Sequence, residues 1–374
     1  MKKVAIIGAG AAGIMCGIQA VSKNTTVVLF DKNPVVGKKL LITGSGRCNY
    51  WNMDMGLEHF HSNNQELLKD FITDEVKSEV LEFFDSIGVV PNIKNGYYYP
   101  YSNQASSIRD LLEAEARRRG VLFSLGEEVK DIFLDNGKFV VDCGSGLEYF
   151  DDLVIATGSK ACPKTGSTGF GYHLAEKFGH HVVDVVPALV QLEASGKFLK
   201  DWSGIRVQCV VRLYEDGLFL KKEMGEAQLT DYGISGICIF NLSRYVSRGL
   251  LENKKEELKI SFLPFLEEKS LEEVELWFKN RIQQLKEYTM VEFLEGILPY
   301  KLVFVVLKRV KISRTRKVEE LSDEEMDALF SYLMEFPLVI VGTRDFSSCQ
   351  VCSGGVLLQE VDSTFQSRFI SNLY

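Results

Sequence analysis

The sequence predicts an α/β fold built on a parallel sheet of the Rossmann type. A short β-branched run at residues 4–7 is typical of a buried parallel strand. Residues 11–22 follow with Ile14, Ile18 and Val21 at helical spacing, and residues 27–30 form a second buried run. A glycine-rich turn joins the first strand to the helix. This β-α-β order places both strands side by side in one parallel sheet.

Size and composition are those of a globular protein. The 374 residues suffice for two or three domains, and 46% of them are hydrophobic and 25% charged. The net charge of −8 argues against a dedicated nucleic-acid binder and against an anchor on an anionic membrane. The eight cysteines are scattered, and no targeting peptide precedes the first strand. We therefore expect a cytoplasmic protein without nucleic-acid or membrane partners, and the oligomeric state stays open.

The later elements continue the same pattern. Helical periodicity covers residues 64–87 and 105–119, and Gly120 after three arginines suits a helix C-terminus. Short alternating runs from 121 to 150, with a turn at Asp135-Asn136-Gly137, predict a β-meander. Residues 152–156 are another parallel-type strand.

The pattern changes beyond Pro187. Strand-like runs extend to about residue 240, a charge-rich helical stretch covers roughly 267–335, and strand signals return at 338–341 and 349–361. The order therefore predicts an α/β domain interrupted by a β domain, which is itself interrupted by helices.

The turn after the first strand matches G-x-G-x-x-G. Gly8 permits the tight turn, Gly10 lets the backbone approach a pyrophosphate, and Gly13 lets helix and strand pack closely. The helix that begins at Ala11 and Ala12 offers free N–H groups and partial positive charge to phosphates. This context predicts a site for the ADP half of a dinucleotide.

Asp31 closes the second strand, 23 positions after Gly8. A carboxylate at this position accepts hydrogen bonds from the adenosine ribose. It would also repel a 2′-phosphate, so NADP is disfavoured in this pocket. The motif itself leaves NAD and FAD open.

Further segments carry a resemblance to a known family. They are GKKLLITGSGRCN at 37–49, LVIATGS at 153–159, GSTGFGY at 166–172, TDYGISG at 230–236 and SGGV at 353–356. In these segments, and over essentially its whole length, the chain resembles the bacterial flavoproteins that include aminoacetone oxidase and relatives linked to bile-acid reduction.

The resemblance implies FAD in an extended pose. Ala12 and Gly13 would lie at the pyrophosphate and Asp31 at the ribose, with Lys32 or Lys38 nearby. Val129 would lie at the adenine, and the strand end at Ala156, Thr157 and Gly158 would approach the cofactor again. Gly46, Arg47, Cys48 and Asn49 would lie near the flavin, and we expect the last three to be the catalytic residues.

The resemblance also implies a glutathione-reductase-like FAD domain with a β-barrel-like substrate domain and a small helical domain inserted. We expect the FAD domain at 1–188 and 345–374, the barrel at 189–264 and 336–344, and the helices at 265–335.

Two departures from the family bear on cofactor binding. The family usually has Asp where this chain has Phe170. Its members also continue beyond the stretch at 367–374 into a tail that contacts the flavin, whereas this sequence stops at Tyr374. The expectation from both is a weakened affinity for FAD.

Other candidate residues receive structural interpretations. Cys349 and Cys352 have C-x-x-C spacing, but positions three apart in a strand face opposite sides. Apart from the adjacent His180 and His181, which cannot easily converge on one ion, the five histidines show no metal-ligand spacing, so no metal is expected. The basic run from Lys308 to Lys317 lacks interleaved aromatic residues and is interpreted as a solvated helix face or an interdomain contact.

The sequence therefore predicts an FAD-dependent oxidoreductase acting on a small organic substrate. Two reactions stay open: amine oxidation with O2, and reduction of a C=C bond by NAD(P)H. There is no second G-x-G-x-x-G, so NAD(P)H would visit the flavin transiently. The alternative is a truncated, non-catalytic flavoprotein remnant with impaired FAD binding.

Overall fold

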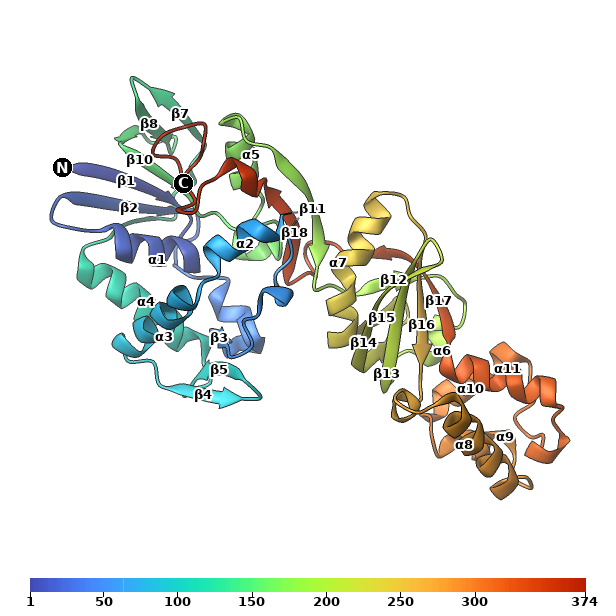
Figure 1. The fold of residues 1–374 in the computed structure, drawn as a ribbon. Coiled ribbons are helices and arrows are strands. Elements are labelled where there is room, and N and C mark those ends of the chain that lie inside the picture. Colours follow the sequence, from blue (N-terminus) through green and yellow to red (C-terminus); the bar gives the residue numbers. More distant parts are fainter. Residues whose placement is uncertain (63) are drawn as a thin grey trace. The chain divides into compact units, whose positions relative to one another are not determined.

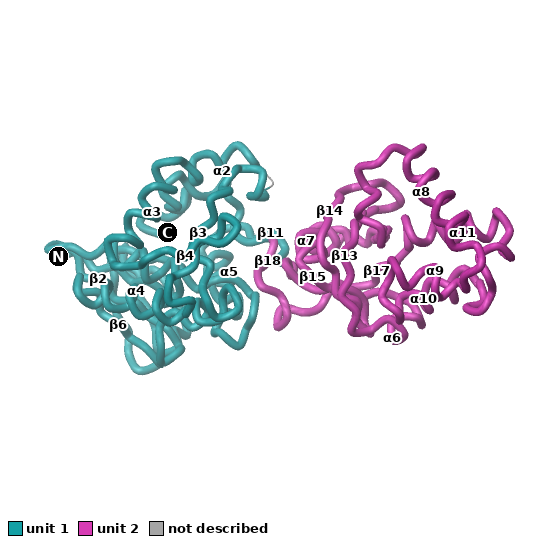
Figure 2. Tube along the Cα trace, turned by 90° about the horizontal axis from the view of Figure 1, so that it is seen from below, with its two compact units in different colours: residues 1–185, 354–374 teal, residues 186–353 magenta. Residues whose placement is uncertain are grey.

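A computed structural model describes residues 1–62 and 64–374, which form two compact units (Figure 2). The first unit comprises residues 1–185 and 354–374, and the second unit comprises residues 186–353. The barrel and the helices expected as separate domains therefore lie in one compact unit. The three-domain division stays a prediction, and its boundaries differ from the observed ones by three to nine residues.

The first unit is built on a parallel sheet in the order β10-β1-β2-β6 (Figure 1). Ile7 on the central strand pairs with Phe30 on one side and Ile155 on the other. The burial of these apolar strands on both faces is what the β-branched runs predicted. The strands are β1 (Lys2–Ile7), β2 (Thr25–Asp31), β6 (Leu122–Leu125) and β10 (Asp152–Ile155).

The predicted meander is wrong at its first strand. β6 pairs in parallel with β2, so it belongs to the Rossmann sheet. Helix α4 (Ala105–Arg119) is the crossover to it and ends at Gly120, whose φ of 97° is left-handed. The remaining strands do form an antiparallel meander, namely β7 (Asp131–Asp135), β8 (Lys138–Asp142) and β9 (Leu147–Phe150).

Helices and a small sheet complete the first unit. The single helix expected over 64–87 is two helices, because the chain breaks at Ile72 and Thr73, and the Thr73 side chain caps the second one. The helices are α1 (Ala11–Ala20), α2 (Gln65–Phe71), α3 (Asp74–Ser86) and α5 (Phe170–Lys177), and the small sheet is β3 (Trp51–Asn52), β4 (Pro91–Lys94) and β5 (Tyr97–Pro100).

The last residues extend the parallel sheet at its β10 edge. Leu373 forms a parallel bridge to Leu153, and the Leu153 amide donates to the Asn372 carbonyl at 2.9 Å. The Tyr374 amide donates to the Leu153 carbonyl at 2.8 Å. A segment more than 200 positions away in sequence thus covers one strand edge.

The second unit contains a closed six-stranded barrel in the order β12-β15-β14-β13-β16-β17, which confirms the expected barrel (Figure 1). Residues 218–229, with the sequence LFLKKEMGEAQL, form one continuous strand, β14. The strands are β12 (Leu192–Ala194), β13 (Arg206–Glu215), β14 (Leu218–Leu229), β15 (Gly233–Gly236), β16 (Glu256–Ser261) and β17 (Phe336–Thr343).

Helices pack on the barrel around one shared core. Trp202 and Phe336 are fully buried at its centre, with ring centroids 5.6 Å apart. The helices of this unit are α6 (Leu199–Trp202), α7 (Ile237–Leu251), α8 (Leu271–Gln284), α9 (Met290–Glu295), α10 (Tyr300–Val310) and α11 (Asp323–Met334).

The chain passes between the units along two paired strands, β11 (Val182–Ala188) and β18 (Val351–Val356). The second unit is therefore one continuous insertion into the first. None of the helices among the described residues combines the length and apolarity needed to cross a bilayer.

Candidate functional site

A cavity of about 1260 Å³ lies within the first unit, and its wall includes the carboxyl ends of three parallel strands at Ile7, Asp31 and Ile155. This is the edge at which open α/β sheets bind ligands. Its volume exceeds the range of about 300–1,000 Å³ that is typical for drug-sized ligands. Of the residues predicted to bind the cofactor, the cavity wall includes Gly8, Gly10, Ala11, Ala12, Asp31, Lys32, Lys38, Val129, Ala156, Thr157 and Gly158.

The N-terminus of α1 opens into this cavity. Gly10 occupies the N-cap position, and no side chain among the described residues caps the helix. The first hydrogen bond of the helix runs from the Ile14 amide to the Gly10 carbonyl, so the amides at Ala11 and Ala12 have no partner within the helix. Both residues are exposed. Free amides and the positive end of the helix dipole make the N-terminus of α1 suitable for binding an anion.

The three glycines of the motif differ in what a side chain at each position would contact. A Cβ on Gly8 would lie 2.4 Å from the Ala156 carbonyl oxygen, and one on Gly13 would lie 1.9 Å from the Gly8 carbonyl oxygen. Both glycines are therefore required by the fold itself. A Cβ on Gly10 would meet nothing within 4 Å, so the fold leaves that space to a ligand.

Asp31 ties two loops of the cavity together. Its Oδ2 accepts the Ala9 amide at 2.8 Å, and its Oδ1 accepts the backbone and side-chain amides of Asn33 at 2.8 and 2.9 Å. A carboxylate has about four acceptor positions, which leaves capacity for a ribose hydroxyl. Asp31 thus holds the glycine loop in place besides offering an acceptor.

Asn33 was not foreseen as a site residue. Its amide nitrogen donates to the Thr165 carbonyl at 3.2 Å, and its amide oxygen accepts from Lys38 Nζ at 3.3 Å. The neighbouring Gly166 has φ of 105°, and a Cβ there would lie 2.4 Å from the Asn33 amide nitrogen. The GSTGFGY segment therefore continues the cavity wall, and the glycines in that segment were the available signal.

Gly13, Gly46, Arg47, Cys48 and Asn49 do not line this cavity. The last four lie in the loop around η1 (Leu40–Gly46), where Ser45 and Cys48 adopt left-handed φ values of 57° and 59°. Non-glycine residues pay a conformational cost there, and such strain is concentrated at functional loops. The catalytic assignment of this loop stays a prediction.

Arg47 is exposed and available for an anionic ligand. Its Nε donates to the Gly44 carbonyl at 3.1 Å, and its guanidinium lies 5.0 Å from the centroid of the Tyr99 ring. Within the described part of the chain, no carboxylate forms an ion pair with it. The cation is thus oriented by neutral groups.

Cys48 is buried in this loop, and Asn49 anchors the loop to neighbouring strands. Burial raises the pKa of the Cys48 thiol, partly offset by a hydrogen bond with Thr43, which disfavours the nucleophilic thiolate. The Asn49 amide nitrogen, oriented toward two carbonyls, donates to Trp51 at 2.7 Å and Tyr98 at 3.1 Å. These bonds fix the loop against β3 and β5.

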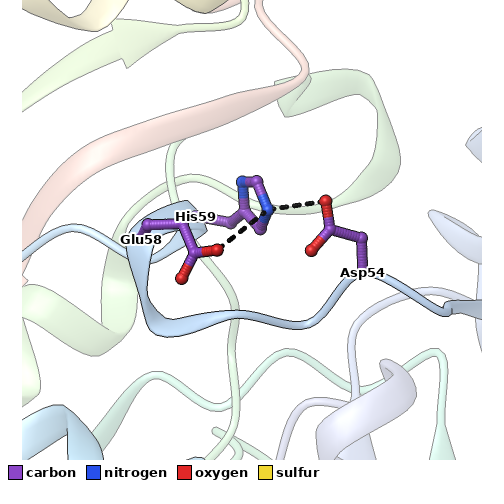
Figure 3. Close-up of side chains that lie close together, drawn as sticks. All are labelled: Asp54, Glu58 and His59. Carbon is purple, nitrogen blue, oxygen red and sulfur yellow. Dashed lines mark ion pairs between the residues drawn. The ribbon is translucent and has the colours of Figure 1, made fainter.

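One group of side chains among the described residues has the geometry of a metal site (Figure 3). His59 Nε2 lies 2.8 Å from Asp54 Oδ2 and 3.9 Å from Glu58 Oε1. All three residues are exposed, and the close contact of His59 Nε2 with Asp54 accounts for their proximity without a metal. The spacing of the histidines in the sequence had assigned no metal-ligand role to His59.

Taken together, the parallel sheet, the glycine loop and the cavity at the strand ends define a Rossmann-type α/β protein. The family model described as "HI0933-like protein Rossmann domain" matches residues 2–374, and the chain belongs to this family.

Named relatives cover nearly the whole chain. The chain is 35% identical to a 3-dehydro-bile acid delta(4,6)-reductase of Clostridium scindens, over 100% of this chain and 91% of the relative. It is 28% identical to a ribosomal RNA dihydrouridine synthase of Escherichia coli, over 99% of this chain and 89% of that protein. Among solved structures, 3-ketosteroid-delta4-(5alpha)-dehydrogenase of Rhodococcus jostii matches 100% of this chain and 90% of its own, at 12% identity and a TM-score of 0.44.

Proposed function

We propose that the chain is an FAD-dependent oxidoreductase that reduces a C=C bond conjugated to a carbonyl group. The observation that carries the cofactor assignment is the uncapped N-terminus of α1 opening into a cavity of about 1260 Å³. The residues present fit the ADP half of FAD. The α1 amides suit the pyrophosphate, the open space at Gly10 suits close approach, and Asp31 suits the ribose.

The type of reaction is inferred from the relatives' names. A delta(4,6)-reductase acting on a 3-dehydro bile acid reduces double bonds conjugated to a ketone. A dihydrouridine synthase reduces the double bond of a uracil ring, which is conjugated to a ring carbonyl. Each reaction adds a hydride to one carbon and a proton to the other, and NAD(P)H is the reductant that we propose. This shared chemistry favours reduction over amine oxidation.

The chain's own residues would position the reactants. When bound, the flavin would supply hydride transfer. Arg47 offers a fixed positive charge on a strained loop, held by the Gly44 carbonyl and the Tyr99 ring. We propose that this charge orients an anionic or carbonyl group of the substrate.

The thiols support a proposal for the cellular compartment. None of the eight cysteines, all of which lie among the described residues, forms a disulfide. Free thiols on a chain of this size suit a reducing compartment, and we propose the cytoplasm.

The test begins with the purified chain. Its visible absorption spectrum and chromatography of any released cofactor should reveal FAD. Anaerobic mixing with NADH or NADPH should bleach the bound cofactor, and an α,β-unsaturated ketone or a uridine oligonucleotide should restore its colour. Turnover of an amine with O2, and none with NAD(P)H, would instead establish the oxidase. A protein that is colourless as purified and fails to take up added FAD would establish a non-catalytic scaffold.

A pair of variants tests Arg47. Arg47→Met should keep bound FAD and lower the rate of reoxidation by the unsaturated substrate by about tenfold to a hundredfold, the usual effect of removing one charge-stabilising group. The control is Arg206→Met, which removes an exposed arginine paired with Glu226 in the second unit. Equal rates in both variants would remove Arg47 from the site.

A further inference from the structure

Two cysteines of the second unit, Cys209 and Cys238, form a buried pair of thiols. Cys209 lies on β13 and is fully buried, and Cys238 is the second residue of α7 and is 1% exposed. Helix α7 packs against the barrel wall formed by β13 and β14 (Figure 1). The two side chains form a hydrogen bond with each other. The oxidoreductase proposal uses neither residue.

The strand register explains how the two thiols meet. Cys209 lies opposite Gly225 of β14 in the antiparallel pairing, so both positions face the same side of the sheet. A Cβ on Gly225 would lie 3.5 Å from the Cys238 Cβ and 4.0 Å from the Cys238 Sγ. Cys238 therefore packs over the position without a side chain that lies directly opposite Cys209.

The N-terminus of α7 makes the two thiols unequal. Gly236 is the N-cap of this helix of 15 residues, and its position provides no side-chain cap. A hydrogen bond from the Cys209 thiol lowers the pKa of Cys238, and the Ile239 and Cys238 amides lower it further, while burial and the charge of Glu223 oppose them. The same contact between the thiols, together with burial, raises the pKa of Cys209. Cys238 is thus the thiol that ionises first, as expected at the start of a helix.

Packing alone does not account for this arrangement. Buried cysteines commonly serve as small apolar side chains, and that role needs no second sulfur nearby. Here the two sulfur atoms also share one strand of the barrel wall. Cys209 Sγ lies 3.6 Å from the Gly225 carbonyl oxygen, and Cys238 Sγ lies 3.7 Å from the carbonyl oxygen of the next residue, Glu226.

A small oxidant can approach the pair from the first turn of α7. Ile237, the residue before Cys238, is 76% exposed, so Cys238 lies one residue from the surface. Hydrogen peroxide is only slightly larger than water, whereas the burial of both sulfur atoms excludes bulky thiol reagents. In a reducing compartment such a pair stays reduced until an oxidant arrives, and disulfides formed there are transient.

We propose that Cys209 and Cys238 form a reversible disulfide when the protein meets hydrogen peroxide. The Cys238 thiolate attacks one peroxide oxygen, which gives a sulfenic acid, and the departing hydroxide takes up a proton to become water. The Cys209 sulfur then displaces the hydroxyl group of the sulfenic acid, which forms the S–S bond and releases a second water. Two thiols and one peroxide thus give one disulfide and two waters. A dithiol reductant restores both thiols by exchange.

The test maps disulfides in the full chain after exposure to hydrogen peroxide. Remaining thiols are blocked with N-ethylmaleimide in denaturant, and tryptic peptides are analysed without reduction by mass spectrometry. Peptide 207–212 should be linked to peptide 223–244, and dithiothreitol should remove the link. We expect the thiols of Cys209 and Cys238 to be lost about tenfold faster than those of Cys143 and Cys352, although the latter two are more exposed.

Single variants separate the roles of the two thiols. Cys209→Ser should leave Cys238 as a sulfenic acid that dimedone labels, because no thiol remains to displace its hydroxyl group. Cys238→Ser should leave Cys209 unlabelled, because burial keeps that thiol protonated. The control is Cys143→Ser, which should form the linked peptide at the rate of the parent. Circular dichroism and the Tm confirm that each variant is folded.

Three outcomes would overturn the proposal. The first is the absence of the linked peptide at peroxide doses that oxidise Cys143 or Cys352. The second is a link that forms only in chains denatured before the peroxide is added. The third is equal dimedone labelling of Cys209 and Cys238 in the two single variants, which would remove Cys238 as the attacking thiol. Because no flavin, reductant or organic substrate enters the measurement, its result is independent of the oxidoreductase proposal.

Discussion

At the scale of single residues, Asp31 is the point where the glycine loop and the Asn33 loop meet. Its two oxygens accept three amide hydrogen bonds. Hydrogen bonds to a charged group contribute about 1.5–3 kcal/mol each when broken singly. We expect Asp31→Ala to weaken FAD binding by about tenfold to a hundredfold, measured by flavin fluorescence titration.

The matched variant for this prediction is Asp31→Asn. It keeps one acceptor oxygen for the Ala9 amide and removes the charge. An intermediate affinity is expected, because the loop is still held. If both variants bind FAD as the parent does, the cofactor does not use this part of the cavity.

Glu256 gives a prediction about pH. It is 2% exposed, and neither carboxylate oxygen has a hydrogen-bond partner within the described residues. Burial, together with the nearby charge of Glu215, raises the pKa of Glu256 to about 7. Because the folded pKa lies above the usual value of 4.5, the folded state holds the proton more tightly. The contribution of Glu256 to stability is therefore most favourable below pH 4.5 and becomes less favourable until the pH has passed about 7.

Glu256→Gln removes this titration while keeping the shape of the neutral acid. We expect the variant to have a higher Tm than the parent at pH 8, by an amount equivalent to about 1–3 kcal/mol, and a similar Tm at pH 5. Glu257→Gln, on the opposite face of the same strand, should show no such pH dependence. An equal loss of Tm at both pH values would mean that Glu256 is ionised and paired in the folded protein.

At the scale of elements, two glycines of the turn from β1 to α1 have different roles. The fold requires Gly13, whereas Gly10 leaves space for a ligand. Gly13→Ala would place a Cβ 1.9 Å from the Gly8 carbonyl oxygen, so the helix must move. We expect a loss of about 1–3 kcal/mol in stability, seen as a lower Tm, with or without cofactor.

Gly10→Ala is the control within the same motif. Its Cβ meets nothing within 4 Å, so the Tm of the cofactor-free protein should stay close to that of the parent. FAD affinity should fall instead, because the methyl group occupies the space through which a phosphate approaches. A cofactor-free protein destabilised equally by both substitutions would contradict this division.

Local patterns predicted the elements that depend on local interactions. The β-branched runs and the glycine turn gave β1, α1 and β2, and the Gly120 signal gave the end of α4. β6 was misassigned because its partner, β2, lies about 90 positions earlier, and strand-like composition does not distinguish parallel from antiparallel pairing. The contribution of Asn33 was missed for the same reason, since it contacts Thr165 across 132 positions.

At the scale of the whole molecule, the segment from Leu357 to Tyr374 is held by a buried carboxylate. Glu360 contacts His180 Nδ1 at 3.2 Å and accepts the His181 amide at 2.8 Å, while His180 Nε2 lies 2.8 Å from Ser367 Oγ. Burial would raise the pKa of Glu360, but hydrogen bonds from His181 and His180 outweigh it and lower that pKa. This contribution to stability is present near neutral pH and is lost on acidification.

Glu360→Ala should therefore loosen this segment. Hydrogen exchange followed by mass spectrometry should show faster exchange in peptides covering 366–374, where the Tyr374 amide pairs with Leu153, and no change in peptides of the second unit. The control is Glu113→Ala, which breaks a surface pair with Arg117 on α4. Unchanged exchange after Glu360→Ala would show that strand pairing alone holds the segment.

The insertion of the second unit into the first has a consequence for biosynthesis. Residues 186–353 are continuous, so all strands of the barrel are synthesised before residues 354–374. The first unit, in contrast, cannot complete the edge of its sheet until Leu373 reaches Leu153. We expect the inserted unit to fold before the first unit, whose sheet edge forms only after Leu373 has been added.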